Sequence, residues 1–464
     1  MGKYDVAVIG AGPGGYVAAI RAAQRGAKTV VIEREEVGGV CLNWGCIPTK
    51  TQIYAAELYR KLRDHGEDYG LRVKDLKVDL EQLVAKKNKV VSLNKGGITK
   101  LLKAHGAETI RGDAVIEAPG RIRVGGKEIT AGAIIVATGS KPAQLPGLET
   151  DGKKIITSTE ALELTKLPKH ITVIGAGALG AEFACLWLNL GVGITLVEML
   201  PQVLPHADEE IAKRIAAGWK KQGMDVRTGV KVSKVTKTGK KVKLTLEGKK
   251  TEEISTDLVL VGIGFDHNSE VVTANPSLGV KTGKRGEILV DDRMETNVKG
   301  VFAVGDVTGK TMLAHGASAE GLVAVENALG GDKRMDYRVL PSCTFTSPEV
   351  ACVGLTEKQA TEKGLDVKAG RFNLVASGRA QSMSEANGMV KIIGDTRTDE
   401  VLGVHIMGPE AGELIASVAM AMQLEATVAE IAHTIHTHPT LSEAIMEAAE
   451  DYYGLSIHTP PKKR

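Results

Sequence analysis

The sequence has a small net charge, no long apolar run and few aromatic residues. Its net charge is only +3 across 464 residues, which is too mild to indicate a nucleic-acid partner. No apolar run approaches the roughly 20 residues that cross a membrane. Met1 leads almost directly into an apolar strand, which leaves no room for a signal or transit peptide. These absences predict a cytoplasmic protein that binds neither nucleic acid nor a membrane.

The composition that remains is typical of glycine-rich nucleotide-binding folds. Glycine contributes 54 residues, hydrophobic residues make up 43% of the chain, and aromatic residues only 3%. The length is sufficient for about three domains.

Cys41 and Cys46 lie in the run GGVCLNWGCIPTK at residues 38–50. They can close a disulfide if the chain between them curls. Pro48 suits the first turn of a helix, so Cys46 would lie near a helix N-terminus, whose positive end lowers the pKa of a thiol. A zinc site would need two more ligands at suitable spacing, and a purely structural disulfide is disfavoured in a chain without an export signal. We interpret the pair as redox-active.

A dinucleotide-binding motif precedes the cysteines in its full context. An apolar strand at residues 4–9 leads into GAGPGG at 10–15, and the helix that follows stops at Gly26. A second strand, at 29–32, then ends in Glu33. Such glycines let backbone N–H groups approach a pyrophosphate at a helix N-terminus, and the acid accepts hydrogen bonds from ribose hydroxyls.

The same unit recurs in the middle of the chain. A strand at 171–174 leads into GAGALG at 175–180, and a later strand at 194–197 ends in Glu198. In both copies the acid follows the third glycine by 18 residues (33 − 15 and 198 − 180). Each copy then runs through a polar meander into a final apolar strand, at 133–139 and at 258–264. This duplication predicts two bound dinucleotides, and the adjacent cysteine pair suggests that one is a flavin.

Glu198 also predicts which nucleotide the second site prefers. A carboxylate at this position accepts from a free ribose 2′-OH and repels a 2′-phosphate. No arginine occurs between Glu198 and Leu204 to offset that repulsion. The second site is therefore expected to bind NAD rather than NADP.

Two further acidic residues mark candidate sites. The apolar strand at residues 301–304 is followed by Gly305 and Asp306, which places a carboxylate where ligands bind in such sheets. Asp306 is equally suited to cap a helix, and the repeats favour a ligand contact.

Near the C-terminus, His438 precedes Pro439 and Glu443 follows five residues later, which offers a base and a carboxylate that orients it. Neighbouring histidines raise a metal site as an alternative, but their spacing and Pro439 disfavour it.

Taken in order, these motifs resemble the flavin-dependent pyridine nucleotide–disulfide oxidoreductases, and the likeness covers nearly the full chain. Within the family they are most similar to the members that oxidise dihydrolipoamide. The resemblance implies an α/β fold with two Rossmann-like domains, for FAD and NAD, and an α+β C-terminal dimerisation domain. It implies an FAD domain at residues 1–148, an NAD domain at 149–268, a central segment at 269–337 and a dimer-interface domain at 338–464.

The resemblance also implies a role for each site residue. Cys41 is the interchange thiol and Cys46 the sulfur on the flavin side, while His438 of one subunit serves the other subunit as a base held by Glu443. We expect a cis bond between His438 and Pro439, and a pair between Lys50 and Glu182 near the flavin. The expected cofactor contacts are Gly10, Gly12, Gly15, Glu33, Lys50, Ala114, Thr138, Gly139, Asp306, Met312, Leu313, Ala314, His315, Gly175, Gly177, Gly180, Glu182, Glu198, Val232 and Gly264.

The implied activity is oxidation of dihydrolipoyl groups on a carrier protein with reduction of NAD, by a homodimer associated with a 2-oxoacid dehydrogenase or glycine-cleavage type of complex. The alternatives are an NAD(P)H-driven reductase of another disulfide and a non-catalytic scaffold, which the intact cysteines, histidine and glutamate disfavour. The chain departs from the family at Gly316, where relatives commonly have lysine. It departs again at residues 264–267, which read GFDH where many relatives have a Gly-Arg-Arg-Pro-like turn.

Overall fold

The computed structural model describes residues 2–144 and 147–461. Its contacts divide the chain into two compact units. The first contains Met1–Gln52, Leu80–Ala143 and Gly264–Asp336, and the second contains Ile53–Asp79, Gln144–Ile263 and Tyr337–Arg464. Each unit is described by itself.

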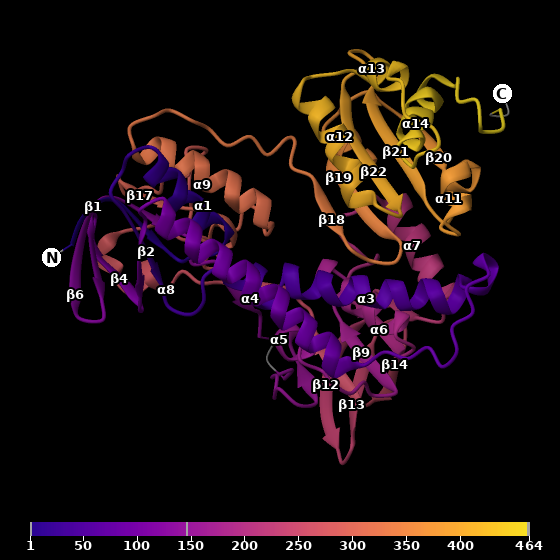
Figure 1. Cartoon of the computed structure of the whole chain (residues 1–464), viewed down its shortest axis with the longest axis horizontal. Coiled ribbons are helices and arrows are strands. Elements are labelled where there is room, and N and C mark those ends of the chain that lie inside the picture. The colour runs from indigo at the N-terminus through magenta and orange to yellow at the C-terminus, as the bar shows by residue number, and fades with distance from the viewer. Residues whose placement is uncertain (1, 145–146, 462–464) are drawn as a thin grey trace. The chain divides into compact units, whose positions relative to one another are not determined.

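The first unit is built on a mixed sheet in the order β3-β2-β1-β6-β5-β4, with β17 also paired to β6 (Figure 1). Its core strands are parallel, as the register Ala7↔Val30 and Ala7↔Ile134 shows. The strands are β1 (Gly2–Ile9), β2 (Thr29–Glu33), β3 (Glu108–Arg111), β4 (Ala114–Ala118), β5 (Arg121–Val124), β6 (Lys127–Val136) and β17 (Val301–Ala303), and a separate ribbon pairs β7 (Ser140–Pro142) with β16 (Phe265–His267).

Helices in this unit follow the glycine turn and the cysteine run. The first helix packs on β1 and β2 and beside the helix that follows Asp306. The helices are α1 (Pro13–Gln24), α2 (Gly39–Trp44), the start of α3 (Cys46–His65), α4 (Leu80–Ala104), α8 (Glu270–Thr273) and α9 (Ala314–Ala328), with short 3₁₀ turns η2 (Pro276–Leu278) and η3 (Gly305–Thr308).

The second unit contains the repeat of this architecture. A parallel sheet has the order β11-β10-β9-β15-β8, and an antiparallel meander has the order β12-β13-β14. The elements are η1 (Glu67–Tyr69), β8 (Ile155–Ile156), α5 (Ser158–Ala161), β9 (His170–Ile174), α6 (Ala178–Asn189), β10 (Gly193–Glu198), α7 (Glu209–Lys221), β11 (Asp225–Thr228), β12 (Lys231–Thr238), β13 (Lys241–Glu247), β14 (Thr251–Thr256) and β15 (Leu258–Val261).

The final apolar strand of each repeat ends earlier than the sequence predicts. β6 ends at Val136 rather than at residue 139, and β15 ends at Val261 rather than at 264. Gly139 and Gly264 have φ values of +67° and +111°, which do not continue a strand. The predicted strand ends are therefore turns, and this places Thr138 and Gly264 beyond the sheet edge.

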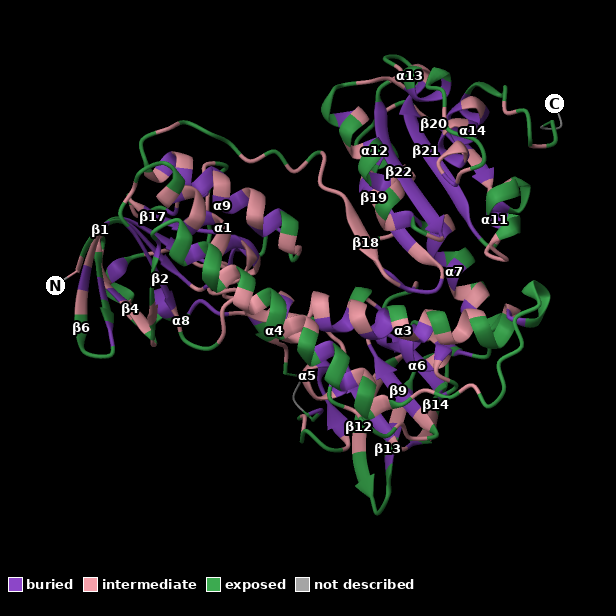
Figure 2. Ribbon diagram, in the orientation of Figure 1, coloured by how far each residue is buried: buried purple, intermediate pink, exposed green. Residues whose placement is uncertain are grey.

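An antiparallel sheet in the order β18-β19-β22-β21-β20 makes up the C-terminal part of the second unit. Helices α12 to α14 cover one face, and Figure 2 shows β21 and β22 buried along their length. The elements are β18 (Ser342–Thr344), β19 (Glu349–Gly354), α10 (Glu357–Glu362), β20 (Val367–Asn373), η4 (Leu374–Ala376), α11 (Gly378–Ser382), β21 (Met389–Asp395), β22 (Val401–Gly408), α12 (Ala411–Gln423), α13 (Val428–His433) and α14 (Glu443–Tyr453).

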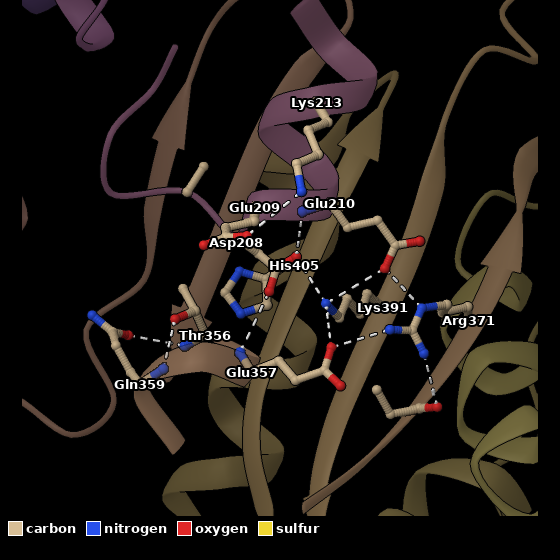
Figure 3. Close-up of polar contacts among 12 residues, drawn as sticks. Asp208, Glu209, Glu210, Lys213, Thr356, Glu357, Gln359, Arg371, Lys391 and His405 are labelled. Atoms are coloured by element: carbon tan, nitrogen blue, oxygen red, sulfur yellow. Dashed lines mark hydrogen bonds and ion pairs between the residues drawn. The ribbon is translucent and has the colours of Figure 1, made fainter. Parts of the chain in front are cut away.

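The other face of this sheet meets α7 through a buried ion-pair network centred on Lys391 (Figure 3). The Nζ of Lys391 lies 2.8 Å from both Asp208 and Glu357, and its side chain is 3% exposed. Arg371, on the neighbouring strand, bonds both Glu210 (2.8 Å) and Glu357 (3.1 Å). Because each buried charge has an opposite partner, the network joins α7 of the second repeat to the C-terminal sheet without leaving an isolated charge.

Lys391→Met is expected to lower the free energy of unfolding by about 3–5 kcal/mol, because it leaves the buried carboxylate of Asp208 without its cation. Lys213→Met is the matched control, since Lys213 is 76% exposed and pairs with Glu209 at 3.6 Å, so its loss should cost under about 0.5 kcal/mol. Chemical denaturation of both variants at one protein concentration makes the comparison. Equal midpoints for the two variants would contradict this account of the network.

Candidate functional site

The two cysteines of the predicted redox pair are joined in a disulfide, with Cα atoms 4.6 Å apart. Cys41 lies in α2, and Cys46 is the first residue of α3, so the helix start predicted from Pro48 is confirmed. Gly45 lies between the helices, and a Cβ there would come within 2.9 Å of the Val40 carbonyl oxygen. Only glycine allows the chain to curl this tightly between the cysteines.

A backbone hydrogen bond and close packing hold the segment that contains the disulfide against the first glycine turn. The Gly38 N–H donates to the Ala11 carbonyl at 2.8 Å, and a Cβ at Gly39 would lie 2.7 Å from the Cα of Gly12. The Asn43 side chain donates to the carbonyl of Gly39 at 2.9 Å. The cysteine pair therefore stands beside the N-terminus of α1, as its place in the sequence suggests.

The two glycine turns have matching geometry. Gly10 and Gly175 have φ values of +101° and +98°, and a Cβ on either would lie 2.3 Å from a carbonyl oxygen of the neighbouring strand segment. A Cβ on Gly15 or Gly180 would lie 1.9 Å from the carbonyl oxygen of the first glycine of its own turn. Only hydrogen fits at these four positions, so each helix starts close against its strand.

Glu33 and Glu198 make the same pair of contacts in the two copies. The carboxylate of Glu33 accepts from the Ala11 N–H at 2.6 Å and from the Glu35 N–H at 2.8 Å. That of Glu198 accepts from the Ala176 N–H at 2.7 Å and from the Leu200 N–H at 2.8 Å. Each acid therefore braces its own glycine turn, a task that the sequence pattern alone did not reveal. A carboxylate accepts about four hydrogen bonds, so both acids keep capacity for a ribose.

Asp306 lies in η3, directly after β17 and before α9. Its Oδ2 accepts a hydrogen bond from the Ser140 hydroxyl at 2.6 Å. Burial raises the pKa of Asp306, although Ser140 and His267 oppose the shift. The residue at the N-cap of α9 is Leu313, so Asp306 does not cap that helix. The sequence left two roles open for Asp306, a helix cap and a ligand contact. The structure is consistent with a ligand contact.

His438 and Glu443 are in contact, as their spacing predicts. The Nδ1 of His438 lies 2.8 Å from Glu443 Oε1, and the other carboxylate oxygen accepts from the Thr440 N–H at 2.7 Å. Partial burial opposes ionisation of Glu443, but the hydrogen bonds from Thr440 and His438 hold its pKa below the usual value. The charged carboxylate keeps the proton of a neutral imidazole on Nδ1, which leaves Nε2 as an acceptor. The side chain of His438 is 80% exposed, and the expected cis bond to Pro439 is present.

The remaining residues that the sequence predicts as cofactor contacts are divided between the two units. Glu182 is buried in α6 and accepts from the Phe345 N–H at 3.0 Å, while Lys50 lies in the second turn of α3. The others lie at turns or element ends: Thr138 and Gly139 after β6, Ala114 at the start of β4, Val232 in β12, Gly264 before β16, and Met312, Leu313, Ala314 and His315 where α9 begins.

Comparison with known proteins places this geometry in a family. The model of the pyridine nucleotide-disulphide oxidoreductases matches residues 4–321, and the model of their dimerisation domain matches residues 340–449. The chain belongs to this family.

Relatives cover the chain from end to end. A dihydrolipoyl dehydrogenase of Thermus scotoductus is 45% identical over 462 residues, 99% of each chain. A mitochondrial dihydrolipoyl dehydrogenase of Pisum sativum is 42% identical, over 98% of this chain and 92% of its own. The crystal structure of LpdA from Mycobacterium tuberculosis superposes with a TM-score of 0.89 at 30% identity, over 97% of this chain and 99% of its own.

The cofactors of this oxidoreductase are FAD and NAD, and its two glycine turns fit their pyrophosphates. The N-cap residues of α1 and α6 are Gly12 and Gly177, so no side chain caps the first N–H groups of either helix. Uncapped N–H groups at a helix start attract a phosphate. A Cβ at Gly177 would meet nothing within 4 Å, and one at Gly12 only the Gly39 Cα at 3.9 Å, so both turns have room for a ligand.

Two polar residues of this oxidoreductase gave no functional signal in the sequence. The Asn268 amide donates to the Thr138 carbonyl at 3.0 Å, while its own Oδ1 is buried without a hydrogen-bond partner among the described residues. His267 donates to the main chain of Asp306. Both follow Gly264 in a segment whose sequence stands out only for its departure from the family pattern. No helix within residues 2–144 and 147–461 is long and apolar enough to cross a membrane.

Proposed function

We propose that this chain oxidises dihydrolipoyl groups on a carrier protein to the lipoyl disulfide and reduces NAD to NADH. The observation that carries the proposal is the Cys41–Cys46 disulfide at the start of α3, beside the first glycine turn. Full-length similarity to dihydrolipoyl dehydrogenases supports this choice of substrate.

The cysteines exchange a disulfide with the substrate in two steps. A substrate thiolate attacks Cys41, the bond to Cys46 breaks, and Cys46 leaves as a thiolate. The second substrate thiol then displaces Cys41, which closes the lipoyl disulfide and leaves both protein sulfurs reduced. The start of α3 favours the negative charge on Cys46. FAD held at the first glycine turn would supply the redox chemistry that connects these two sulfurs to NAD.

His438 acts as the base that takes the proton of the substrate thiol. Glu443 holds its Nδ1, so the exposed Nε2 is the accepting atom. The enzyme is a homodimer, as the match of residues 340–449 to a dimerisation domain supports, and we assign His438 to the site of the partner subunit. Carrier proteins of 2-oxoacid dehydrogenase or glycine-cleavage complexes are the partners we propose.

Two sets of residues would hold the cofactors. The FAD set is the first turn with Glu33, Lys50, Ala114, Thr138, Gly139, Asp306 and the start of α9, and the NAD set is the second turn with Glu198, Val232 and Gly264. Glu198 is 8% exposed, so a 2′-phosphate would bring two negative charges together where water screens them poorly. We therefore propose NAD rather than NADP, domain boundaries at 148, 268 and 337, and a cytoplasmic location.

Steady-state assays test the function. We expect NAD to be reduced with free dihydrolipoamide, and NADP to give much lower catalytic efficiency. A reductase of another disulfide would instead oxidise NADPH with glutathione disulfide and leave dihydrolipoamide untouched. That pattern would overturn the proposal. Equal catalytic efficiency with NAD and NADP would overturn the role assigned to Glu198. An inactive scaffold would turn over in neither assay.

A further inference from the structure

His267 contacts the backbone of the Asp306 loop. Its Nδ1 lies 2.6 Å from the main-chain oxygen of Asp306. A carbonyl oxygen only accepts, so the imidazole Nδ1 carries the proton and donates. A Cβ placed at Gly309 would lie 3.5 Å from the Cε1 of His267, so the imidazole ring lies close to Gly309, the C-cap residue that follows η3.

Ser140 contacts Asp306 from the opposite strand of the same ribbon. β7 and β16 are antiparallel, and their register pairs His267 directly with Ser140. Ser140 donates to the side chain of Asp306 at 2.6 Å, while His267 donates to its main chain. Two facing residues of one ribbon therefore fix both the backbone and the carboxylate of Asp306.

The ribbon lies where the chain leaves and re-enters the first unit. That unit includes the chain up to Ala143 and again from Gly264, so β7 precedes the departure and β16 follows the return. The pairing of β7 with β16 fixes these two segments relative to each other. The hydrogen bonds donated by Ser140 and His267 fix both segments relative to η3. Within the first unit, Asp306 is thus held by residues far from it in sequence.

We infer that His267 is a positioning residue for FAD, acting through the backbone of Asp306. The inference rests on the proposed function, in which Asp306 contacts FAD. Burial disfavours the charged form of Asp306, as its raised pKa indicates, and the loop must present this carboxylate in one orientation to be useful to a ligand. In the Gly-Arg-Arg-Pro-like turn of many relatives the corresponding residue is proline, which has no side-chain donor. The hydrogen bond from His267 to the Asp306 loop is therefore a contact that such relatives cannot make.

Three substitutions of His267 separate the hydrogen bond from packing. In His267→Asn the amide nitrogen reaches about where Nδ1 stands, so a donor is kept without the ring. His267→Gln places the amide nitrogen about where Nε2 stands, too far along the side chain, and His267→Phe keeps an aromatic ring without any donor. Lys141→Met is the matched control, because Lys141 lies next to Ser140 on the ribbon but pairs with Glu270 at 2.6 Å.

The measurement is FAD release from the holoenzyme, followed by the rise in flavin fluorescence, together with the dissociation constant of FAD from the apoprotein. Loss of one net hydrogen bond should raise that constant roughly 2- to 10-fold in His267→Phe and His267→Gln. His267→Asn and Lys141→Met should stay within about twofold of the unmodified enzyme. At saturating FAD, the KM values for NAD and dihydrolipoamide should be unchanged in all four variants.

Two results would overturn the inference while leaving the proposed function intact. In the first, the unmodified enzyme binds FAD and His267→Phe binds it equally well. In the second, His267→Asn loses FAD as readily as His267→Phe, which would show that restoring the donor does not restore binding. Failure of the proposed function looks different, because the unmodified enzyme would then bind FAD but would not reduce NAD with dihydrolipoamide.

Discussion

Cys46→Ser is expected to abolish oxidation of dihydrolipoamide and to remove the long-wavelength absorbance of the two-electron-reduced enzyme. That absorbance requires a thiolate beside the flavin, and Cys46, at the start of α3, is the sulfur whose negative charge the helix favours. Cys41→Ser should also lose turnover, because no sulfur remains to exchange with the substrate. It should, however, keep the absorbance, since the Cys46 thiolate is then present permanently.

The contrast between the two variants is the informative result, because both have lost the disulfide. Absorbance spectra recorded without oxygen, beside assays with dihydrolipoamide, give both readouts. Full lipoamide activity in Cys46→Ser would show that the disulfide is not on the path of the electrons. Long-wavelength absorbance in Cys46→Ser but not in Cys41→Ser would reverse the two roles.

His438→Gln is expected to lower turnover with dihydrolipoamide by roughly 10²–10⁴-fold, the usual contribution of a general base. NADH should still reduce the bound flavin at its normal rate, because that half-reaction does not use the thiol base. Glu443→Gln should have a smaller effect of the same kind, since it leaves the imidazole in place but removes the charge 2.8 Å from Nδ1. Rapid-mixing experiments with each reductant separate the two half-reactions.

Mixing two inactive variants tests whether the base comes from the partner subunit. Cys46→Ser and His438→Gln homodimers are combined under conditions that exchange subunits. Each heterodimer should then contain one complete site and recover up to half of normal activity per dimer. No recovery despite verified exchange would place the base and the disulfide of one site in the same chain.

Local patterns in the sequence predicted the parts of the site whose partners are close in the chain. The two glycine turns, the disulfide and the contact between His438 and Glu443 each span a few residues, so spacing alone constrains them. The duplication supplied the longer-range expectation that Glu33 and Glu198 are equivalent, and their matching contacts agree with it.

Contacts between distant segments were not predictable in this way. Ser140 and Asp306 are 166 residues apart, and no periodic pattern relates them. Lys391 stands between apolar residues of β21, and its partner Asp208 is 183 residues away in sequence. Such pairs depend on which elements the fold brings together. The strand ends at Val136 and Val261 were missed for a local reason, because the positive φ values of Gly139 and Gly264 do not show in hydrophobicity.

The central claim is that electrons from dihydrolipoamide pass through Cys41 and Cys46 before they reach NAD. Alkylation followed by mass spectrometry of the holoenzyme, without oxygen, tests it most directly. A limiting amount of dihydrolipoamide should make both cysteines reactive, and excess NAD added before the alkylating reagent should protect them again while NADH forms. NADH formation with no new reactivity at either cysteine during the reaction would contradict the claim, as would cysteines that stay reactive after NAD is added.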